Sequence, residues 1–147
     1  MTAPSAADLL LVEDDPADVE LTVRALKEAR VVNAVVSVPD GAAALDYLFA
    51  TGAYAHRAEA PPPKVVFLDL KLPKLSGLEV LERIKAEPST REIPVVVLTS
   101  SAEEPDVKRA YALGANSYIV KPVHFEAFLE AIGHAGLYWL LLNRPPR

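Results

Sequence analysis

The stretch Val65-Val66-Phe67-Leu68-Asp69 places one acid directly after four apolar residues. A short, continuous apolar run is typical of a strand buried on both faces, as in a parallel sheet that helices cover on each side. In open sheets of that kind, ligands bind beyond the carboxyl ends of the strands. Asp69 is therefore a candidate for chemistry rather than for packing.

Other apolar runs also end in polar residues. They are Leu9–Val12 before Glu13, Asp14 and Asp15; Val95–Leu98 before Thr99; and Tyr118–Val120 before Lys121 and Pro122. Because parallel strands end at one edge of a sheet, we expect these acids, the hydroxyl and the amine to lie near Asp69.

Segments of helical period separate the runs, which predicts five β-α units in a doubly wound α/β sheet. A further strand is expected at Val35–Val38, and a helix at Gly41–Phe49. Asp15 and Pro16 are typical of a helix start, so Asp15 is interpreted as a cap rather than a ligand. The proline-rich stretch Thr51–Pro63 is expected to be an irregular surface loop.

The composition predicts a single domain over residues 1–147. The predicted strands and helices lie in a core at about 8–132, which leaves a C-terminal extension at about 133–147. The chain has 147 residues, 51% of them hydrophobic, no cysteine and a net charge of -5. This excludes disulfides and thiolate metal sites, and it argues against nucleic-acid or membrane partners. No signal peptide or membrane span is recognisable, so a cytoplasmic protein is expected.

If the first and third strands are neighbours, Glu13, Asp14 and Asp69 converge and their charges repel. Mg²⁺ would remove that conflict, because it prefers oxygen ligands and also binds phosphate. Thr99 and Lys121 would then contact phosphoryl oxygens. Together these groups suit an in-line phosphoryl transfer that forms an aspartyl phosphate.

These motifs jointly resemble the response-regulator receiver domain of two-component signalling, from about Asp8 to Ile132. The resemblance implies a flavodoxin-like five-stranded parallel sheet in the order 2-1-3-4-5, with an extended C-terminal helix or tail. It also implies a signalling protein that catalyses only its own phosphorylation and dephosphorylation.

The resemblance further implies roles for individual residues. Asp69 would be the phosphoacceptor, Asp14 a direct Mg²⁺ ligand, Glu13 a ligand through water, and Lys71 a ligand through its backbone carbonyl. Thr99 and Tyr118 would be the switch pair, Lys121 would bind the phosphoryl group, and the Lys121-Pro122 bond would be cis.

A narrower resemblance is to the single-domain regulators of bacterial phytochrome histidine kinases. It rests on Val12–Asp18, Thr51–Pro63, Leu98–Ser101 and the ending Tyr138-Trp139-Leu140. It implies a phytochrome-type sensor histidine kinase as the partner.

The C-terminal run is apolar on all sides and therefore needs burial on all sides. It comprises Leu137, Tyr138, Trp139, Leu140, Leu141 and Leu142. The expected partner surface is that of a homodimer. The alternative is a tail that folds back over its own domain.

Rival functions stay open at this point. The protein would be a phosphate sink, a phosphorelay intermediate, or a constitutive dimeric adaptor whose site is vestigial. A haloacid-dehalogenase-type phosphatase would want a second aspartate where this chain has Lys71.

Overall fold

The computed structural model describes residues 8–29, 34–121 and 125–139. Within them one parallel sheet is formed by β1 (Leu9–Val12), β2 (Val35–Val38), β3 (Val65–Leu68), β4 (Val95–Thr99) and β5 (Ser117–Val120). The strands lie in the order β2-β1-β3-β4-β5. The flavodoxin-like order expected from the sequence is thereby confirmed.

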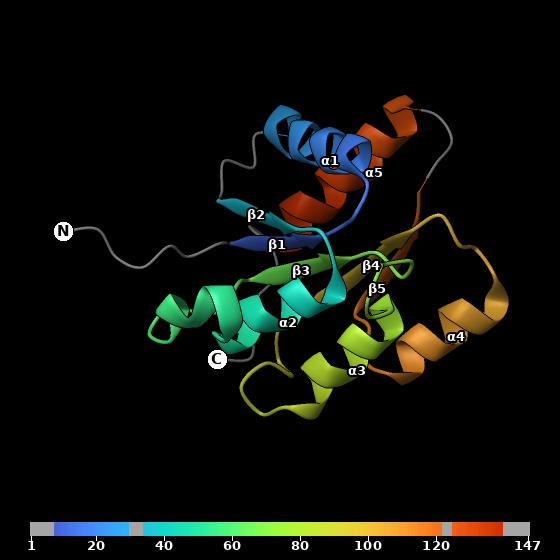
Figure 1. The fold of residues 1–147 in the computed structure, drawn as a ribbon. Helices are drawn as coiled ribbons and strands as arrows, with labels where there is room; N and C mark the ends of the chain where they lie inside the picture. Colours follow the sequence, from blue (N-terminus) through green and yellow to red (C-terminus); the bar gives the residue numbers. More distant parts are fainter. Residues whose placement is uncertain (1–7, 30–33, 122–124, 140–147) are drawn as a thin grey trace.

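Helices cover both faces of this sheet. They are α1 (Pro16–Glu28), α2 (Gly41–Phe49), α3 (Gly77–Ala86), α4 (Glu104–Ala112) and α5 (Phe125–Leu137). Among the described residues, no helix has the length and apolar content that crossing a bilayer requires. Figure 1 shows α1 and α5 on one face, and α2, α3 and α4 on the other. The sheet is therefore doubly wound, and its strand ends stay open at one edge.

The helix starts follow from capping side chains. The Asp15 carboxylate accepts a hydrogen bond of 2.9 Å from the amide of Ala17, which confirms Asp15 as the cap of α1. Asp40 caps α2 in the same way, accepting from Ala43 at 2.8 Å. Each cap satisfies an amide that the helix leaves unpaired, which contributes about 1 kcal/mol.

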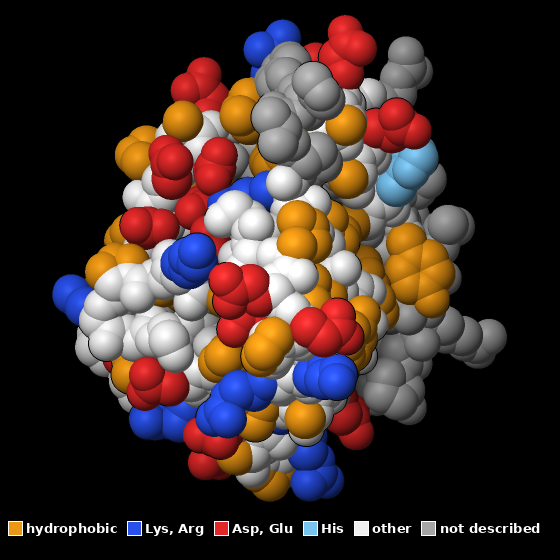
Figure 2. Space-filling view, turned by 90° about the vertical axis from the view of Figure 1, so that its right-hand side faces the viewer, with side chains coloured by type: hydrophobic (Ala, Val, Ile, Leu, Met, Phe, Trp, Pro, Cys, Tyr) orange, Lys and Arg blue, Asp and Glu red, His pale blue; other side chains and the backbone are white. Residues whose placement is uncertain are grey.

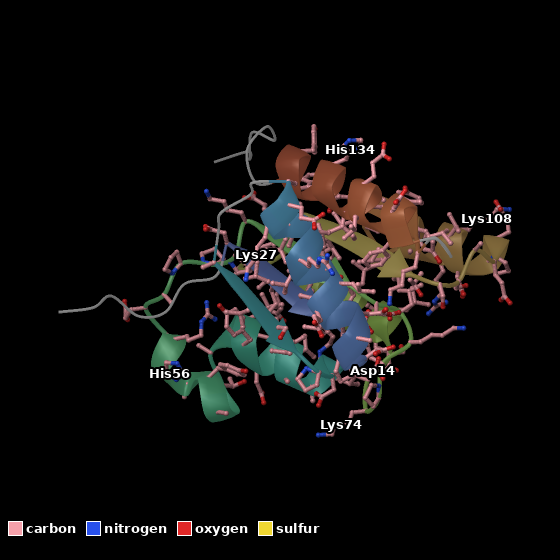
Figure 3. All side chains as sticks on the ribbon, turned by 90° about the horizontal axis from the view of Figure 1, so that it is seen from above. Asp14, Lys27, His56, Lys74, Lys108 and His134 are labelled. Carbon is pink, nitrogen blue, oxygen red and sulfur yellow. The ribbon has the colours of Figure 1, made fainter. Side chains whose placement is uncertain are left out.

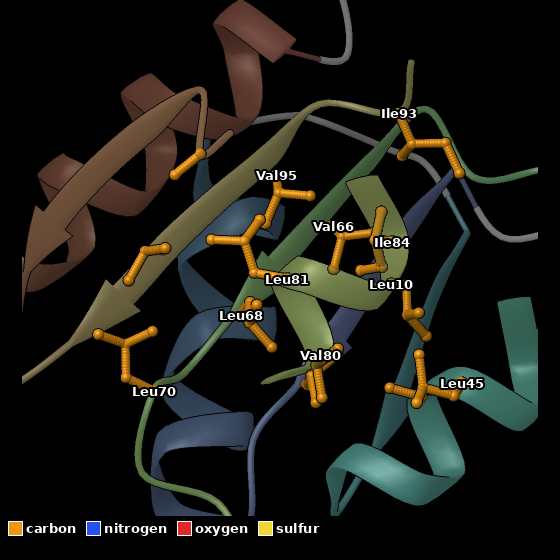
Figure 4. Packing of buried hydrophobic residues seen from close by; sticks show 14 of the residues in the cluster. Leu10, Leu45, Val66, Leu68, Leu70, Val80, Leu81, Ile84, Ile93 and Val95 are labelled. Atoms are coloured by element: carbon orange, nitrogen blue, oxygen red, sulfur yellow. The ribbon is translucent and has the colours of Figure 1, made fainter. Parts of the chain in front are cut away.

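The core consists of two apolar layers, one on each side of the sheet. Side chains alternate along each strand, so Leu10, Val66 and Leu68 face α3 while their neighbours face α1 and α5. Figure 4 shows these three residues against Leu81 and Ile84 of α3. Burying one such side chain stabilises the fold by roughly 1.5–3 kcal/mol.

The expectation of an irregular loop at Thr51–Pro63 is wrong in part, because Gly52–Arg57 forms a short 3-10 helix, η1. Arg57 is 5% exposed, and its guanidinium lies 3.5 Å from the centre of the Tyr47 ring. It donates hydrogen bonds to the carbonyls of Tyr47 and Pro61. An aromatic ring and two carbonyls thus order a segment whose composition is typical of a loop.

Candidate functional site

Three carboxylates meet where β1 and β3 end. Leu68 lies in register with Val12, so the residues that follow them, Asp69 and Glu13, emerge side by side. Carboxylate oxygens of Glu13, Asp14 and Asp69 lie within 4.8 Å of one another. Figure 2 looks onto this edge and shows acidic side chains gathered on one part of it. The structure thus brings together the acids that the sequence predicts to converge.

Backbone hydrogen bonds hold the acids in place. The Asp69 amide donates to the Val12 carbonyl at 3.1 Å, which extends the pairing of β1 and β3 by one step. The Asp69 carboxylate in turn accepts from the Lys71 amide at 3.1 Å. The expected role of the Lys71 carbonyl as a metal ligand stays a prediction.

The three acids differ in their access to water. Glu13 is 4% exposed and Asp69 is 8% exposed, whereas Asp14 is exposed. Figure 3 shows Asp14 beside the first turn of α1, at the end of that helix opposite Lys27. The cluster is therefore buried at Glu13 and Asp69 and open to solvent at Asp14.

Lys121, which follows β5, reaches the same cluster. Its ammonium donates to Glu13 at 2.5 Å, to Asp18 at 2.7 Å and to Asp69 at 3.0 Å. Its side chain is only 11% exposed. The predicted cation thus lies against the predicted nucleophile, and three carboxylates share it.

Burial and charge act in opposite directions on the ionisation of this cluster. Burial raises the pKa of Glu13 to about 7, although the hydrogen bond from Lys121 lowers it. Burial alone would lower the pKa of Lys121, but its hydrogen bonds with Asp18 and Glu13 outweigh that effect and raise this pKa. Lys121 is therefore a cation at neutral pH, and Glu13 accepts a proton more readily than an ordinary glutamate.

The donor set fits a hard divalent cation. Glu13, Asp14 and Asp69 offer oxygen ligands alone, which is what Mg²⁺ prefers, and Mg²⁺ usually keeps several waters. The exposed side of the cluster, at Asp14, provides access for those waters. Lys121 supplies a single positive charge to three close acids, so a divalent cation would relieve the remaining repulsion.

Thr99 and Tyr118 are joined through a residue between them in sequence, Ser101. Thr99 is fully buried at the end of β4, and its hydroxyl accepts a hydrogen bond of 3.4 Å from the Ser101 amide. The Tyr118 hydroxyl donates to the Ser101 carbonyl at 2.8 Å. Burial raises the pKa of Tyr118, so this hydroxyl stays protonated. Both expected switch residues thus contact the loop that leads from β4 to α4.

Sequence reasoning missed two contributors, Asp18 and Ser101. Asp18 lies in the first turn of α1, where an acid is common because it favours a helix start. The Ser101 hydroxyl donates to Asp106 at 2.5 Å and accepts from the Glu103 amide at 3.4 Å. The sequence signal for Ser101 is its place two residues before the start of the predicted helix at Glu103, where serine side chains commonly bond to the backbone. Asp18 carried no such signal, because its contact with Lys121 spans most of the chain.

Part of the predicted set lies outside the described residues. This holds for Pro122, and thus for the predicted cis bond, and for Leu140, Leu141 and Leu142 of the predicted partner surface. Within the described part of that surface, Tyr138 is 48% exposed, and its ring packs edge-on against Trp139. Trp139 packs against the core layer between the sheet, α1 and α5. At the described end of the tail, Trp139 therefore packs on its own domain while Tyr138 stays exposed to solvent.

Residues 9–133 match the family model of the response regulator receiver domain. Among curated proteins, the chain is 42% identical over 139 residues to the probable methanogenesis regulatory protein FilR2 of Methanothrix harundinacea, covering 94% of this chain and 86% of that protein. It is 38% identical over 132 residues to the response regulator Rcp1 of Synechocystis sp., covering 90% and 88%.

Solved structures extend the similarity over nearly the whole chain. The phosphorylated cyanobacterial phytochrome response regulator RcpA is 38% identical, with a TM-score of 0.88 over 97% of this chain and 100% of RcpA. The Mn²⁺-bound form of Rcp1 is 36% identical, with a TM-score of 0.86 over 98% and 100%. The bacteriophytochrome response regulator AtBRR is 52% identical, with a TM-score of 0.74 over 96% and 100%. Sequence, strand order and strand-end chemistry agree, and the chain belongs to the response regulator receiver domain family.

Proposed function

We propose that this chain accepts a phosphoryl group from a phosphohistidine of a sensor kinase onto Asp69, with Mg²⁺ as cofactor. The observation that carries this proposal is the meeting of Asp69 with Glu13, Asp14 and Lys121 at one edge of the sheet. A carboxylate nucleophile, two further acids and an ammonium are the parts that phosphoryl transfer to an aspartate needs.

In the proposed reaction, an Asp69 carboxylate oxygen attacks phosphorus in line with the leaving nitrogen of the histidine. The oxygen–phosphorus bond forms and the phosphorus–nitrogen bond breaks. The phosphohistidine ring reacts with a proton on its other nitrogen and keeps that proton, so it departs as a neutral imidazole. The Lys121 ammonium lies 3.0 Å from the Asp69 carboxylate. It would exchange this carboxylate for a phosphoryl oxygen and offset the negative charge of that oxygen.

Glu13, Asp14 and Asp69 would hold the cation, with Asp14 as a direct ligand, Glu13 acting through water and the Lys71 carbonyl completing the protein's share. When bound, Mg²⁺ would offset the negative charge that gathers on the transferring group. The Mn²⁺-bound form of the relative Rcp1 supports a divalent cation in this family.

The proposed switch begins at Thr99. If its hydroxyl turns to a phosphoryl oxygen, it gives up the hydrogen bond from the Ser101 amide. The Ser101 carbonyl is the acceptor for Tyr118, so Tyr118 would then be free to move with the loop. We infer that phosphorylation changes the protein surface at β5 and at the start of α4.

The experiment treats the purified full chain with acetyl phosphate and Mg²⁺ and measures the intact mass. We expect one phosphoryl group on the wild type and none on Asp69→Asn. Asp46→Asn is the matched control, because that carboxylate lies on α2 and bonds to Thr51 instead of the cluster. Catalytic release of phosphate from simple esters would favour the phosphatase alternative instead.

We further propose a phytochrome-type histidine kinase as the phosphodonor and a cytoplasmic location beside it. The support is the 51% and 52% identity to the bacteriophytochrome response regulators RtBRR and AtBRR, which exceeds the 42% identity to FilR2. Rates of phosphotransfer from the organism's own kinases test this partner. Rapid transfer back to the kinase, or onward to a second histidine, would assign the chain as a phosphate sink or a relay intermediate.

We also propose a homodimer formed through the C-terminal tail, resting on the exposed ring of Tyr138 next to an apolar run. An exposed aromatic ring beside an apolar stretch of sequence favours association with a second copy.

A further inference from the structure

The Lys121 ammonium, which contacts Asp69, has one partner outside the proposed metal-binding acids. Lys121 contacts Glu13, Asp69 and Asp18, but only the first two belong to the cluster whose oxygens lie within 4.8 Å of one another. Asp18 lies on α1, has a side-chain exposure of 27% and contacts the Lys121 ammonium at 2.7 Å.

Lys121 and a divalent cation draw on the same two carboxylates, those of Glu13 and Asp69. A cation held by Asp69, and by Glu13 through water, would draw on the two carboxylates that now accept from the lysine. The Lys121 ammonium would then lose Glu13 and Asp69 as partners in a place where only 11% of its side chain is exposed. An unpaired charge at such burial is costly. Among the described residues, Asp18 is the remaining carboxylate that contacts Lys121.

We propose that Asp18 is a positioning residue for Lys121, an inference that rests on the proposed function. Asp18 keeps the Lys121 ammonium paired at the edge of the site. Glu13 and Asp69 can then exchange the lysine for the divalent cation. Lys121 therefore lies close enough to contact the phosphoryl group and leaves the metal site open.

A structural role alone has a different signature. An acid in the first turn stabilises a helix start whatever else it contacts, so Asp18→Asn lowers stability slightly under either explanation. Only the positioning role makes the affinity for Mg²⁺ depend on Asp18 through Lys121. Without Asp18 the ammonium stays on Glu13 and Asp69, and the cation must displace it.

The test is calorimetric titration of the full chain with Mg²⁺. We expect Asp18→Asn to weaken binding about tenfold, the usual effect of losing a group that supports metal ligands. Glu20→Gln is the matched control, since it removes the same charge from the same helix, and Glu20 has no ion pair with Lys121 among the described residues. It should change the affinity less than about twofold.

Two further variants make the result decisive. Asp18→Glu, which keeps the charge and can still reach Lys121, should restore most of the affinity. In a Lys121→Met background, Asp18→Asn should have no larger effect than Glu20→Gln. Equal weakening by Asp18→Asn and Glu20→Gln, or a full Asp18→Asn effect without Lys121, would overturn the positioning role while leaving the metal site intact. A wild-type chain that binds no Mg²⁺ would overturn both this inference and the proposed function.

Discussion

Gly77 lies directly against the backbone of Asp69. A Cβ atom placed on Gly77 would be 2.2 Å from the Asp69 carbonyl oxygen and 2.5 Å from the Leu70 Cα. The Gly77 amide also donates to the Leu70 carbonyl at 2.9 Å. The start of α3 thus packs on the chain that follows β3, and only glycine permits this approach.

Gly77→Ala is therefore expected to displace the segment that carries Asp69 and to lower the free energy of unfolding by about 2–3 kcal/mol. Urea denaturation measures this loss. Gly133→Ala is the control, because its nearest neighbour would be the Ala29 methyl group at 3.1 Å. A Gly133→Ala loss as large as that of Gly77→Ala would contradict the argument.

Glu13 makes the stability of the metal-free protein depend on pH. Its pKa is about 7 in the folded chain, against an ordinary value of 4.5, so the folded state binds the extra proton. Stability from this group is present below the ordinary pKa and is lost as the pH rises through about 7. In EDTA, the free energy of unfolding should fall by up to about 3 kcal/mol between about pH 5 and pH 8.

Glu13→Gln removes the titrating group, so its unfolding free energy should lack this fall. Denaturation curves of both chains over that pH range provide the measurement. Parallel pH profiles for the wild type and Glu13→Gln would show that Glu13 does not titrate as described.

Ser101 ties the end of β4 to the start of α4. Ser101→Ala removes the hydroxyl that donates to Asp106 and accepts from the Glu103 amide, so we expect a loss of about 1 kcal/mol. Ser100→Ala should be nearly neutral, because that side chain is exposed. Amide exchange at the start of α4 should accelerate in Ser101→Ala alone. Equal effects of the two alanines would refute the link.

Tyr138 tests the proposed dimer. Tyr138→Ser should weaken self-association, measured by sedimentation velocity over a range of concentrations, and should leave monomer stability within about 0.5 kcal/mol. Tyr111 on α4 is 50% exposed, close to the 48% of Tyr138, so Tyr111→Ser is the matched control. A dimer that Tyr111→Ser dissociates and Tyr138→Ser does not would use the α4 surface instead of the tail.

The fold was readable from the sequence because its strands are short apolar runs with clear ends. Val35–Val38 and Gly41–Phe49 match β2 and α2 residue for residue. Sheet order came from the family resemblance, since apolar runs alone do not say which strand lies beside which. The 3-10 helix η1 was missed because the burial of Arg57 depends on the Tyr47 ring and on two carbonyls.

In the candidate site, too, residues positioned by strand pairing are predictable from the sequence, and residues positioned by helix packing are not. Asp69, Glu13 and Asp14 follow strands that pair, so the sequence predicts their convergence if β1 and β3 are neighbours. Asp18 lies on a helix, and its contact with Lys121 depends on how α1 sits beside the end of β5. Local pattern does not encode that packing.

The phosphoacceptor role of Asp69 is tested most directly by chemical trapping. The full chain is phosphorylated with acetyl phosphate and Mg²⁺, reduced with borohydride, which converts an aspartyl phosphate to homoserine, and mapped by peptide mass spectrometry. We expect homoserine at position 69, and none in a chain treated without phosphodonor. Homoserine at another aspartate, with position 69 unmodified, would contradict it.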